Sequence, residues 1–328
     1  MWWHRTFIAG LALALALPLA AQSANEKDLK DIGHRGVGDG MNFYSLEKEI
    51  ALGKSLAQQF DATARIEKDP VVNEYINRLT QNLVRHSDAK VPFTVRVVES
   101  PEVNAEALPG GYFFVNTGLI LAANNESELA GVMAHEIAHV AARHGTRNAT
   151  KGELINYATF PLIFVGGGIG MAARSAAEIA VPLGFLKFDR NDEKEADYLG
   201  LQYMYEAGYD PQSFVQMFEK ILSQEKKQPG TVAKAFETHP PTPDRIKDSE
   251  KEIANLLPPR PEYVVDTSEF EQVKARLAML EHQNETQLKL HGQGKPSLIN
   301  PNGTPVNAPP DTNPKGRPTL ERRPDETQ

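Results

Sequence analysis

The sequence predicts an α+β fold that is mainly helical, with a small antiparallel sheet beside one central helix. Apolar residues recur at spacings of three, four and seven across residues 45–86, which favours two amphipathic helices. Residues 93–98 alternate as a strand does, and a Pro-Gly-Gly turn leads into a second β-prone segment. Residues 126–144 form the clearest helical pattern, with Asn125 as its N-cap and Gly145 as its stop.

Further helices are expected in the second half of the chain. One runs from about Asp192 to Ala207 and is closed by Gly208, and the next extends from Pro211 to about Gln224. A last amphipathic helix should dock on the body of the protein through Phe270, Val273, Leu277 and Leu280.

The composition excludes several classes of function. The 328 residues carry a net charge of −8 with dispersed Lys and Arg, so we expect no nucleic-acid partner. The absence of cysteine excludes a thiol nucleophile, a disulfide framework, a cysteine-ligated metal and a lipid-modified cysteine at the N-terminus. Any metal must therefore be held by histidine and carboxylate ligands.

The chain divides into four predicted segments. Residues 1–24 combine a short basic start, an apolar stretch and small residues, as in a signal peptide. A single membrane anchor is the alternative, but the apolar run is shorter than the ~20 residues of a spanning helix. Residues 25–258 form the main domain, residues 259–290 a helical extension, and residues 291–328 a disordered proline-rich tail. We therefore expect an exported, periplasmic protein.

The central motif is His-Glu-Ile-Ala-His at residues 135–139. Residues four apart on a helix share a face, so the imidazoles of His135 and His139 can reach one ion. Glu136 stands beside the first histidine, where its carboxylate can take a proton from a metal-activated water. A capped helix with apolar flanks makes an accidental surface pair of histidines the weaker interpretation. The motif predicts one Zn²⁺ per subunit, with Glu136 as the general base.

A third protein ligand is needed, because a catalytic zinc takes about three and keeps one position open. The positions where metzincins carry a glycine and a third histidine hold Ala142 and Gly145. On a continuous helix His144 lies about 140° away from His139, where it would cap or pack rather than bind the metal.

The acidic segment 192–197 supplies carboxylates instead. Glu193 and Asp197 are four residues apart and share a helix face, whereas Glu195 points elsewhere. We favour Glu193 as the metal ligand and Asp197 as the residue that orients a ligand histidine. An acidic first turn that only complements the helix dipole is the alternative.

A proline-rich loop, Thr-His-Pro-Pro-Thr-Pro-Asp-Arg, occupies residues 238–245. His239 and Arg245 are candidates to stabilise the oxyanion of a tetrahedral intermediate. A plain turn before a helix is the other interpretation.

These motifs, taken in order, resemble a family of gluzincin peptidases, those of the HtpX, BepA and CAAX-prenyl-protease type. The similarity covers residues 45–255, and residues 104–119 look like the family's edge strand beside the cleft. The resemblance implies a zincin-type metallopeptidase domain over residues 25–258, in the periplasmic BepA-like branch. It implies that His135, His139 and Glu193 bind the metal, that Glu136 is the base and that Asp197 supports the ligands. It also implies that His239 is an occluding fourth ligand in a resting state and that Arg245 helps to hold the intermediate.

The chain also departs from that family's pattern. Glu106 stands where an aromatic or aliphatic residue is usual, which could change preference in the cleft. Asp189 replaces a common serine before Arg190, and the C-terminal repeat domain of BepA-like proteins is not expected here. Partner docking through such repeats is therefore in doubt.

The expected function is a zinc metalloendopeptidase that hydrolyses misfolded or misassembled envelope polypeptides. The uncharged residues 155–173 should form a buried or cleft-covering element, because one membrane crossing would separate His139 from Glu193. Such an element is compatible with a peripheral contact with the membrane or with outer-membrane assembly. The alternatives are a zinc aminopeptidase, with Glu106 on the substrate's amino group, and a latent chaperone or scaffold closed by His239. The oligomeric state is not defined.

Overall fold

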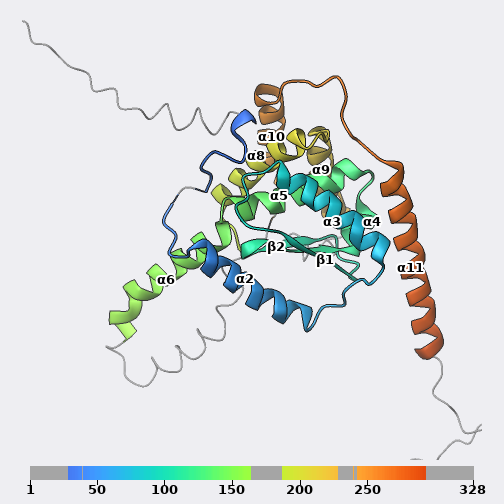
Figure 1. Cartoon of the computed structure of the whole chain (residues 1–328), viewed down its shortest axis with the longest axis horizontal. Helices are drawn as coiled ribbons and strands as arrows, with labels where there is room; N and C mark the ends of the chain where they lie inside the picture. The colour runs from blue at the N-terminus through green and yellow to red at the C-terminus, as the bar shows by residue number, and fades with distance from the viewer. Residues whose placement is uncertain (1–28, 39, 164–186, 228–238, 240–241, 293–328) are drawn as a thin grey trace, which may run out of the picture. The chain divides into compact units, whose positions relative to one another are not determined.

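The computed structural model describes residues 29–38, 40–163, 187–227, 239 and 242–292. The predicted signal peptide lies outside these residues, as do residues 164–173 of the uncharged segment and residues 293–328 of the predicted tail, so those predictions stay untested. The helices and strands, shown in Figure 1, are η1 Leu29–Asp31, α2 Leu46–Asp61, α3 Pro70–Arg85, β1 Thr94–Val98, β2 Ala105–Leu108, η2 Pro109–Gly111, β3 Tyr112–Asn116, α4 Thr117–Ala122, α5 Glu126–Ala141, α6 His144–Ile163, α8 Arg190–Glu206, α9 Gln212–Lys227, α10 Pro243–Leu256 and α11 Ser268–Gly292.

The two amphipathic helices expected over residues 45–86 are confirmed as α2 and α3. The Ser45 hydroxyl accepts a hydrogen bond from the backbone N–H of Lys48 at the start of α2. Asp69 caps α3 in the same way, and Pro70 occupies its first turn, where a missing N–H costs nothing. Both helices therefore begin where side chains satisfy their first backbone donors.

The sheet is mixed, which corrects the expectation of an antiparallel sheet. The strand order is β1-β3-β2, with β2 antiparallel to β3 and β1 parallel to β3. The Pro-Gly-Gly turn joins β2 and β3 in a hairpin, whereas the two predicted strands, β1 and β3, pair in parallel. The chain leaves β1 through residues 99–104 and enters the sheet again at the far side of β3, so β1 and β3 run the same way.

The helix that carries the His-Glu-Ile-Ala-His motif is α5, and its side chains are buried along its whole length. Asn125 caps it through a hydrogen bond from the N–H of Glu128, as predicted. The predicted stop at Gly145 is wrong by a few residues. Arg143 adopts a left-handed backbone conformation, with φ of 57°, and a new helix, α6, begins at His144.

The prediction of two helices after residue 190 is also confirmed. Asp189 caps α8 in a capping box with Asp192, and Gly208, with φ of +95°, follows its end. The next helix, α9, begins one residue after Pro211. The acidic segment 192–197 thus lies in the first two turns of α8, where Glu193 and Asp197 lie beside His135 of α5.

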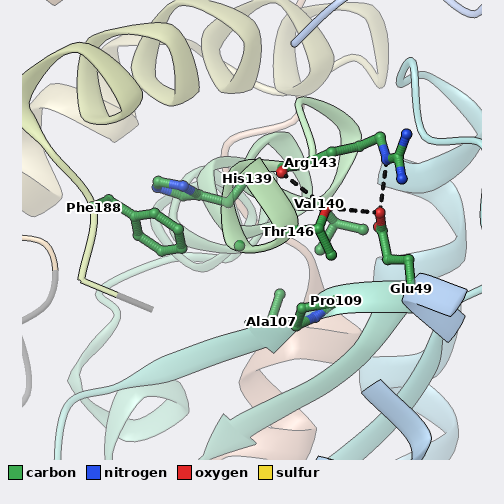
Figure 2. A pocket seen from close by; sticks show the side chains of 9 residues that line it. Glu49, Ala107, Pro109, His139, Val140, Arg143, Thr146 and Phe188 are labelled. Carbon is green, nitrogen blue, oxygen red and sulfur yellow. Dashed lines mark hydrogen bonds and ion pairs between the residues drawn. The ribbon is translucent and has the colours of Figure 1, made fainter. Parts of the chain in front are cut away.

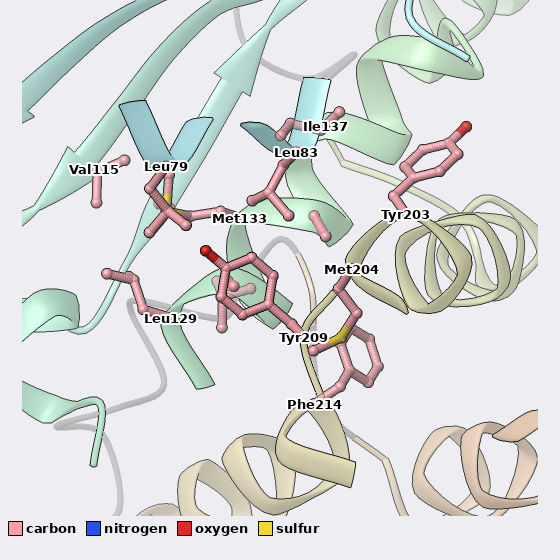
Figure 3. Packing of buried hydrophobic residues seen from close by; sticks show 14 of the residues in the cluster. Leu79, Leu83, Val115, Leu129, Met133, Ile137, Tyr203, Met204, Tyr209 and Phe214 are labelled. Atoms are coloured by element: carbon pink, nitrogen blue, oxygen red, sulfur yellow. The ribbon is translucent and has the colours of Figure 1, made fainter. Parts of the chain in front are cut away.

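The main hydrophobic core lies where α5 meets α3, α8, α9 and the sheet (Figure 3). Met133 and Ile137 of α5 are fully buried among Leu83 of α3, Tyr203 of α8 and Phe214 of α9. Each large apolar side chain buried here contributes roughly 1.5–3 kcal/mol to stability. It also fixes α5, the helix of the motif, at the centre of the packed elements.

Residues 268–278 of α11 belong to the compact unit Met1–Ala278, and residues from Met279 onward form a second unit. In the first unit Phe270, Val273 and Leu277 are buried, and the ring of Phe270 lies 6.2 Å from that of Tyr75 on α3. The expected docking of this helix is confirmed for these residues. In the described part of the chain no helix has the length and apolar composition needed to cross a membrane.

Candidate metal centre

Four buried side chains converge beside the middle of α5. His135 and His139 come from α5, Glu193 from the first turn of α8, and His239 from the loop before α10. One possible ligand atom from each lies within 4.8 Å of the others. His135 Nε2 and His139 Nε2 are 3.1 Å apart, and each lies 3.5 Å from an oxygen of Glu193. The fold thus brings all of the predicted ligands to one point.

These distances fit a tetrahedral zinc site. Ligand atoms bound about 2.1 Å from such an ion lie roughly 3.4 Å apart, close to the 3.1 and 3.5 Å found here. Two histidine nitrogens that face each other at this distance need either a shared proton or a metal between them. Imidazole and carboxylate are also ligands that zinc prefers. The residues present therefore fit the metal that the motif predicts.

The electrostatics of the cluster favour a cation. Burial lowers the pKa of His139 well below its ordinary value, so this imidazole is neutral and offers a lone pair. Burial alone would raise the pKa of Glu193, but hydrogen bonds from His135, His139 and His239 outweigh it and lower that pKa. Burial alone would lower the pKa of His135, but hydrogen bonds to Asp197 and Glu193 outweigh it and raise that pKa to about 9.

Asp197 and Arg245 lie behind the cluster. Asp197 Oδ1 is 3.0 Å from Nδ1 of His135, which leaves Nε2 of that ring directed at the site. The guanidinium of Arg245 donates two hydrogen bonds to Asp197, at 2.7 and 2.6 Å, and lies 2.8 Å from Glu193. Arg245 therefore contacts Asp197 and the predicted ligand Glu193, and its role on the oxyanion stays a prediction.

Glu136 and His239 face each other across the site. Glu136 Oε2 accepts a hydrogen bond of 3.3 Å from the backbone N–H of Ala107, on β2. Glu136 Oε1 lies 3.7 Å from His239 Nε2, and His239 Nδ1 lies 2.8 Å from Glu193. The predicted base therefore sits between the metal ligands and the outer strand of the sheet, and His239 fills the space on the other side.

His144 is a member of the site that the sequence interpretation missed. Its Nδ1 lies 2.8 Å from Nδ1 of His139, and its Nε2 lies 3.1 Å from Glu195. These contacts are satisfied when His139 Nδ1–H donates to His144 and His144 Nε2–H donates to Glu195. His139 then keeps Nε2 unprotonated for a metal. The left-handed residue Arg143 redirects His144, and this backbone turn carries no periodic signal in the sequence.

A second group of contacts fixes the C-terminal end of α5 (Figure 2). The buried carboxylate of Glu49, on α2, accepts hydrogen bonds from Arg143 at 2.7 Å and from Thr146 at 3.0 Å. On the other side of the helix the ring of Phe188 stacks on that of His139, with centroids 4.0 Å apart. These contacts hold the last turn of α5 and the orientation of the His139 ring.

The packing of α8 against α5 depends on a glycine. A Cβ added at Gly200 would lie 3.0 Å from the backbone N and Cα of His135. The two helices are therefore as close as their backbones allow at this point. The close approach brings Asp197 and Glu193, about one and two turns earlier on α8, within reach of the predicted ligand histidines.

A comparison with known protein families matches the part of the chain that contains the site. Residues 69–253, which include all of the clustered side chains, match peptidase family M48. The chain belongs to peptidase family M48. The family resemblance seen in the motifs is thereby confirmed, and the mainly helical fold with a small sheet agrees with the zincin-type expectation.

Several relatives within or near this family are similar over much of the chain. The beta-barrel assembly-enhancing protease of Escherichia coli K12 is 32% identical over 295 residues, covering 86% of this chain and 58% of that protein. Its counterpart from Yersinia pestis is 33% identical over 232 residues, covering 66% and 46%. The mitochondrial metalloendopeptidase OMA1 of Schizosaccharomyces pombe is 30% identical over 179 residues, covering 54% and 52%. The chain spans about half the length of these relatives.

Proposed function

We propose that this chain is a zinc metalloendopeptidase in which His135, His139 and Glu193 hold the metal and Glu136 is the general base. The observation that carries the proposal is the convergence of four buried ligand atoms within 4.8 Å, with Glu136 beside them. Membership of a peptidase family supports the same reaction class. Zinc is proposed over other divalent ions because its preferred ligands and distances match this donor set.

Each residue of the cluster has a part in the proposed reaction. When bound, zinc would activate a water molecule and polarise the carbonyl of the scissile peptide bond. Glu136 takes the proton of the attacking water and delivers it to the leaving amine. The N–H of Ala107 keeps the Glu136 carboxylate against β2, at 3.3 Å. Asp197 fixes the ring of His135, and Arg245 fixes both Asp197 and Glu193.

The proposed substrates are misfolded or misassembled polypeptides of the cell envelope, and the proposed location is the periplasm. This rests on the predicted signal peptide and on the names of the relatives, which refer to the assembly of β-barrels. A net charge of −8 does not suit a nucleic-acid substrate.

The mechanism is tested by digestion of casein by the zinc-loaded protein beside Glu136→Gln. We expect the variant to retain zinc and to lose at least about 100-fold in rate, as is typical when a general base is removed. Glu74→Gln, an exposed glutamate on α3, is a matched control that should digest casein at the wild-type rate. Zinc content is measured on all three proteins. Equal cleavage by a zinc-containing Glu136→Gln variant would refute the mechanism.

A latent resting state is a second proposal, and the position of His239 favours it. Its ring lies 2.8 Å from Glu193 and 3.7 Å from Glu136, in the space where a substrate carbonyl would have to enter. His239 could therefore occupy the open position of the metal as a fourth ligand. The chain would then act only after His239 leaves this position.

Replacement of His239 separates a latent enzyme from a chaperone or scaffold without activity. We expect His239→Ala to bind zinc and to digest casein several-fold faster than the wild type. A variant that binds zinc but cleaves no faster would count against latency. Cleavage of casein with a blocked N-terminus would also exclude the aminopeptidase alternative, because an aminopeptidase requires a free α-amino group.

A further inference from the structure

Glu106 occupies a position on β2 that a bound polypeptide would reach. Successive residues of a strand direct their backbone N–H and C=O groups to alternate sides. The backbone carbonyl of Asn104, just before β2, accepts a hydrogen bond from the backbone N–H of Asn116 on β3. Alternation therefore directs the backbone groups of residues 104 and 106 toward β3 and those of Ala105 and Ala107 toward the outer edge. The bond from Ala107 N–H to Glu136 agrees with this pattern. No described strand pairs with that outer edge, which lies beside the proposed base.

The side chain of Glu106 lies on the sheet face opposite to Ala105 and Ala107, which belong to the main core. There it lines a cavity of about 430 Å³. Phe60 and Phe114 form an apolar wall of this cavity, with ring centroids 4.2 Å apart. A large cavity with an apolar wall thus lies at Glu106, next along the strand to Ala107, whose N–H bonds to Glu136.

The charge of the cavity is negative. Three glutamates line it, Glu99, Glu102 and Glu106, and the one cation in its lining, Arg65, is paired with Glu99 at 2.7 Å. Among the described residues none donates a hydrogen bond to Glu106 or forms an ion pair with it. Burial and the nearby Glu136 raise the pKa of Glu106, so a cation beside it would relieve an unfavourable interaction.

We propose that Glu106 and this cavity bind the side chain of a lysine or arginine of the substrate, close to the scissile bond. The proposal rests on the proposed peptidase function and defines its specificity. The methylene groups of such a side chain suit the wall of Phe60 and Phe114, and its charged end suits the carboxylate of Glu106. A neutral aromatic or aliphatic residue at position 106 would offer only the apolar half of this site.

The geometry favours a side chain over the substrate's α-amino group. A peptide that pairs with the outer edge of β2 has its backbone level with Ala105 and Ala107. The residue opposite Glu106 in such a pair directs its side chain to the same face of the sheet as Glu106. An α-amino group would remain in the plane of the strands, away from the cavity.

The test compares peptides that differ only in lysine or norleucine, with the variable residue placed at each position in turn. Each peptide is made with an acetylated and with a free N-terminus. Binding is measured by fluorescence anisotropy to zinc-loaded Glu136→Gln, in which the peptides survive. At one position we expect the lysine peptide to bind about tenfold more tightly, as for one partly buried charge pair. A second substitution in the same protein, Glu106→Gln, should reduce the ratio of lysine to norleucine affinity to about one. Glu106→Lys in its place should favour a peptide with glutamate at that position. Glu74→Gln, an exposed glutamate on α3 that does not line the cavity, is the matched control and should keep the ratio.

Three results would overturn the proposal: equal binding of lysine and norleucine peptides at every position, a lysine preference that survives Glu106→Gln, or a preference that requires a free α-amino group. The last result would point to the aminopeptidase alternative. Casein digestion by the wild type reports on the peptidase function separately. A lysine preference that depends on Glu106 would support the specificity site even if casein stayed intact.

Discussion

At the scale of single residues, His139 is held on both sides of its ring. Nε2 faces His135 and Glu193, and Nδ1 lies 2.8 Å from Nδ1 of His144, which in turn contacts Glu195. A ligand histidine whose second nitrogen is hydrogen-bonded has a fixed tautomer and a fixed ring orientation. His144 is therefore a positioning residue for the metal, although it does not touch the metal position itself.

Replacement of His144 by leucine should weaken zinc binding by roughly 10–100-fold, because His139 loses the partner that fixes its Nδ1–H. His144→Asn keeps an acceptor near His139 and should lose less. Zinc affinity is measured by competition with a chelator, and the melting temperature of the metal-free proteins serves as the control for folding. Glu195 stays paired with Arg147 at 3.1 Å, so the leucine variant does not leave that carboxylate without a partner. A folded leucine variant with wild-type zinc affinity would show that the contact is only structural.

At the scale of secondary-structure elements, the site depends on how closely α8 lies against α5. A Cβ added at Gly200 would lie 3.0 Å from the backbone of His135, so a side chain there would push α5 and α8 apart by a few tenths of an ångström. The first turn of α8 is in addition fixed by the Asp189 capping box, which satisfies the backbone donors next to Glu193. Packing and capping together determine where Glu193, the proposed third ligand, lies.

Gly200→Ala should separate the two helices and lower the free energy of unfolding by about 1–3 kcal/mol, as overpacked cores do. Zinc affinity should fall as well, since Glu193 moves with α8. Gly152→Ala on α6 is the matched control, because nothing lies within 4 Å of its added Cβ, and it should be neutral or slightly stabilising. Chemical denaturation and zinc titration of both variants check this. A Gly200→Ala protein as stable and as tightly zinc-binding as the control would contradict the close-packing argument.

At the scale of the whole molecule, buried polar contacts join segments that are distant in the chain. Arg35, near the start of the described chain, pairs with Asp88 at 2.9 Å and donates to Gln202 on α8 at 2.7 Å. Tyr203 donates to the same aspartate at 2.8 Å. The proposed metal adds a further link of this kind, because its ligands come from α5, α8 and the loop before α10.

Removal of the metal should therefore destabilise the protein as a whole. Zinc at 1,000 times its dissociation constant would add about 4 kcal/mol to the free energy of unfolding, since only the folded chain brings the ligands together. We expect EDTA to lower the melting temperature by several degrees and added zinc to restore it. Glu136→Gln should show the same shift, whereas Glu193→Gln should show little or none. A melting temperature of the zinc-loaded protein that does not respond to EDTA would argue against the assigned ligands.

The local parts of this protein could be predicted from its sequence. His135, His139 and Glu136 lie on one capped helix, and Glu193 and Asp197 on another, so helical periodicity was enough to place each set on a common face. The helices α2, α3, α8 and α9 follow from the same periodicity and from their capping residues. The family was also evident from the order and spacing of the motifs.

Only the tertiary structure decided how these parts meet. The left-handed Arg143 turned His144 onto His139, the return of the chain beyond β3 made the sheet mixed, and packing placed Arg245 on Asp197 and Glu193. Each depends on contacts between segments far apart in the chain, or on one backbone angle that leaves no periodic trace. Periodicity reports which face of an element a residue occupies, whereas the partner of that face is chosen by the packing of the whole core.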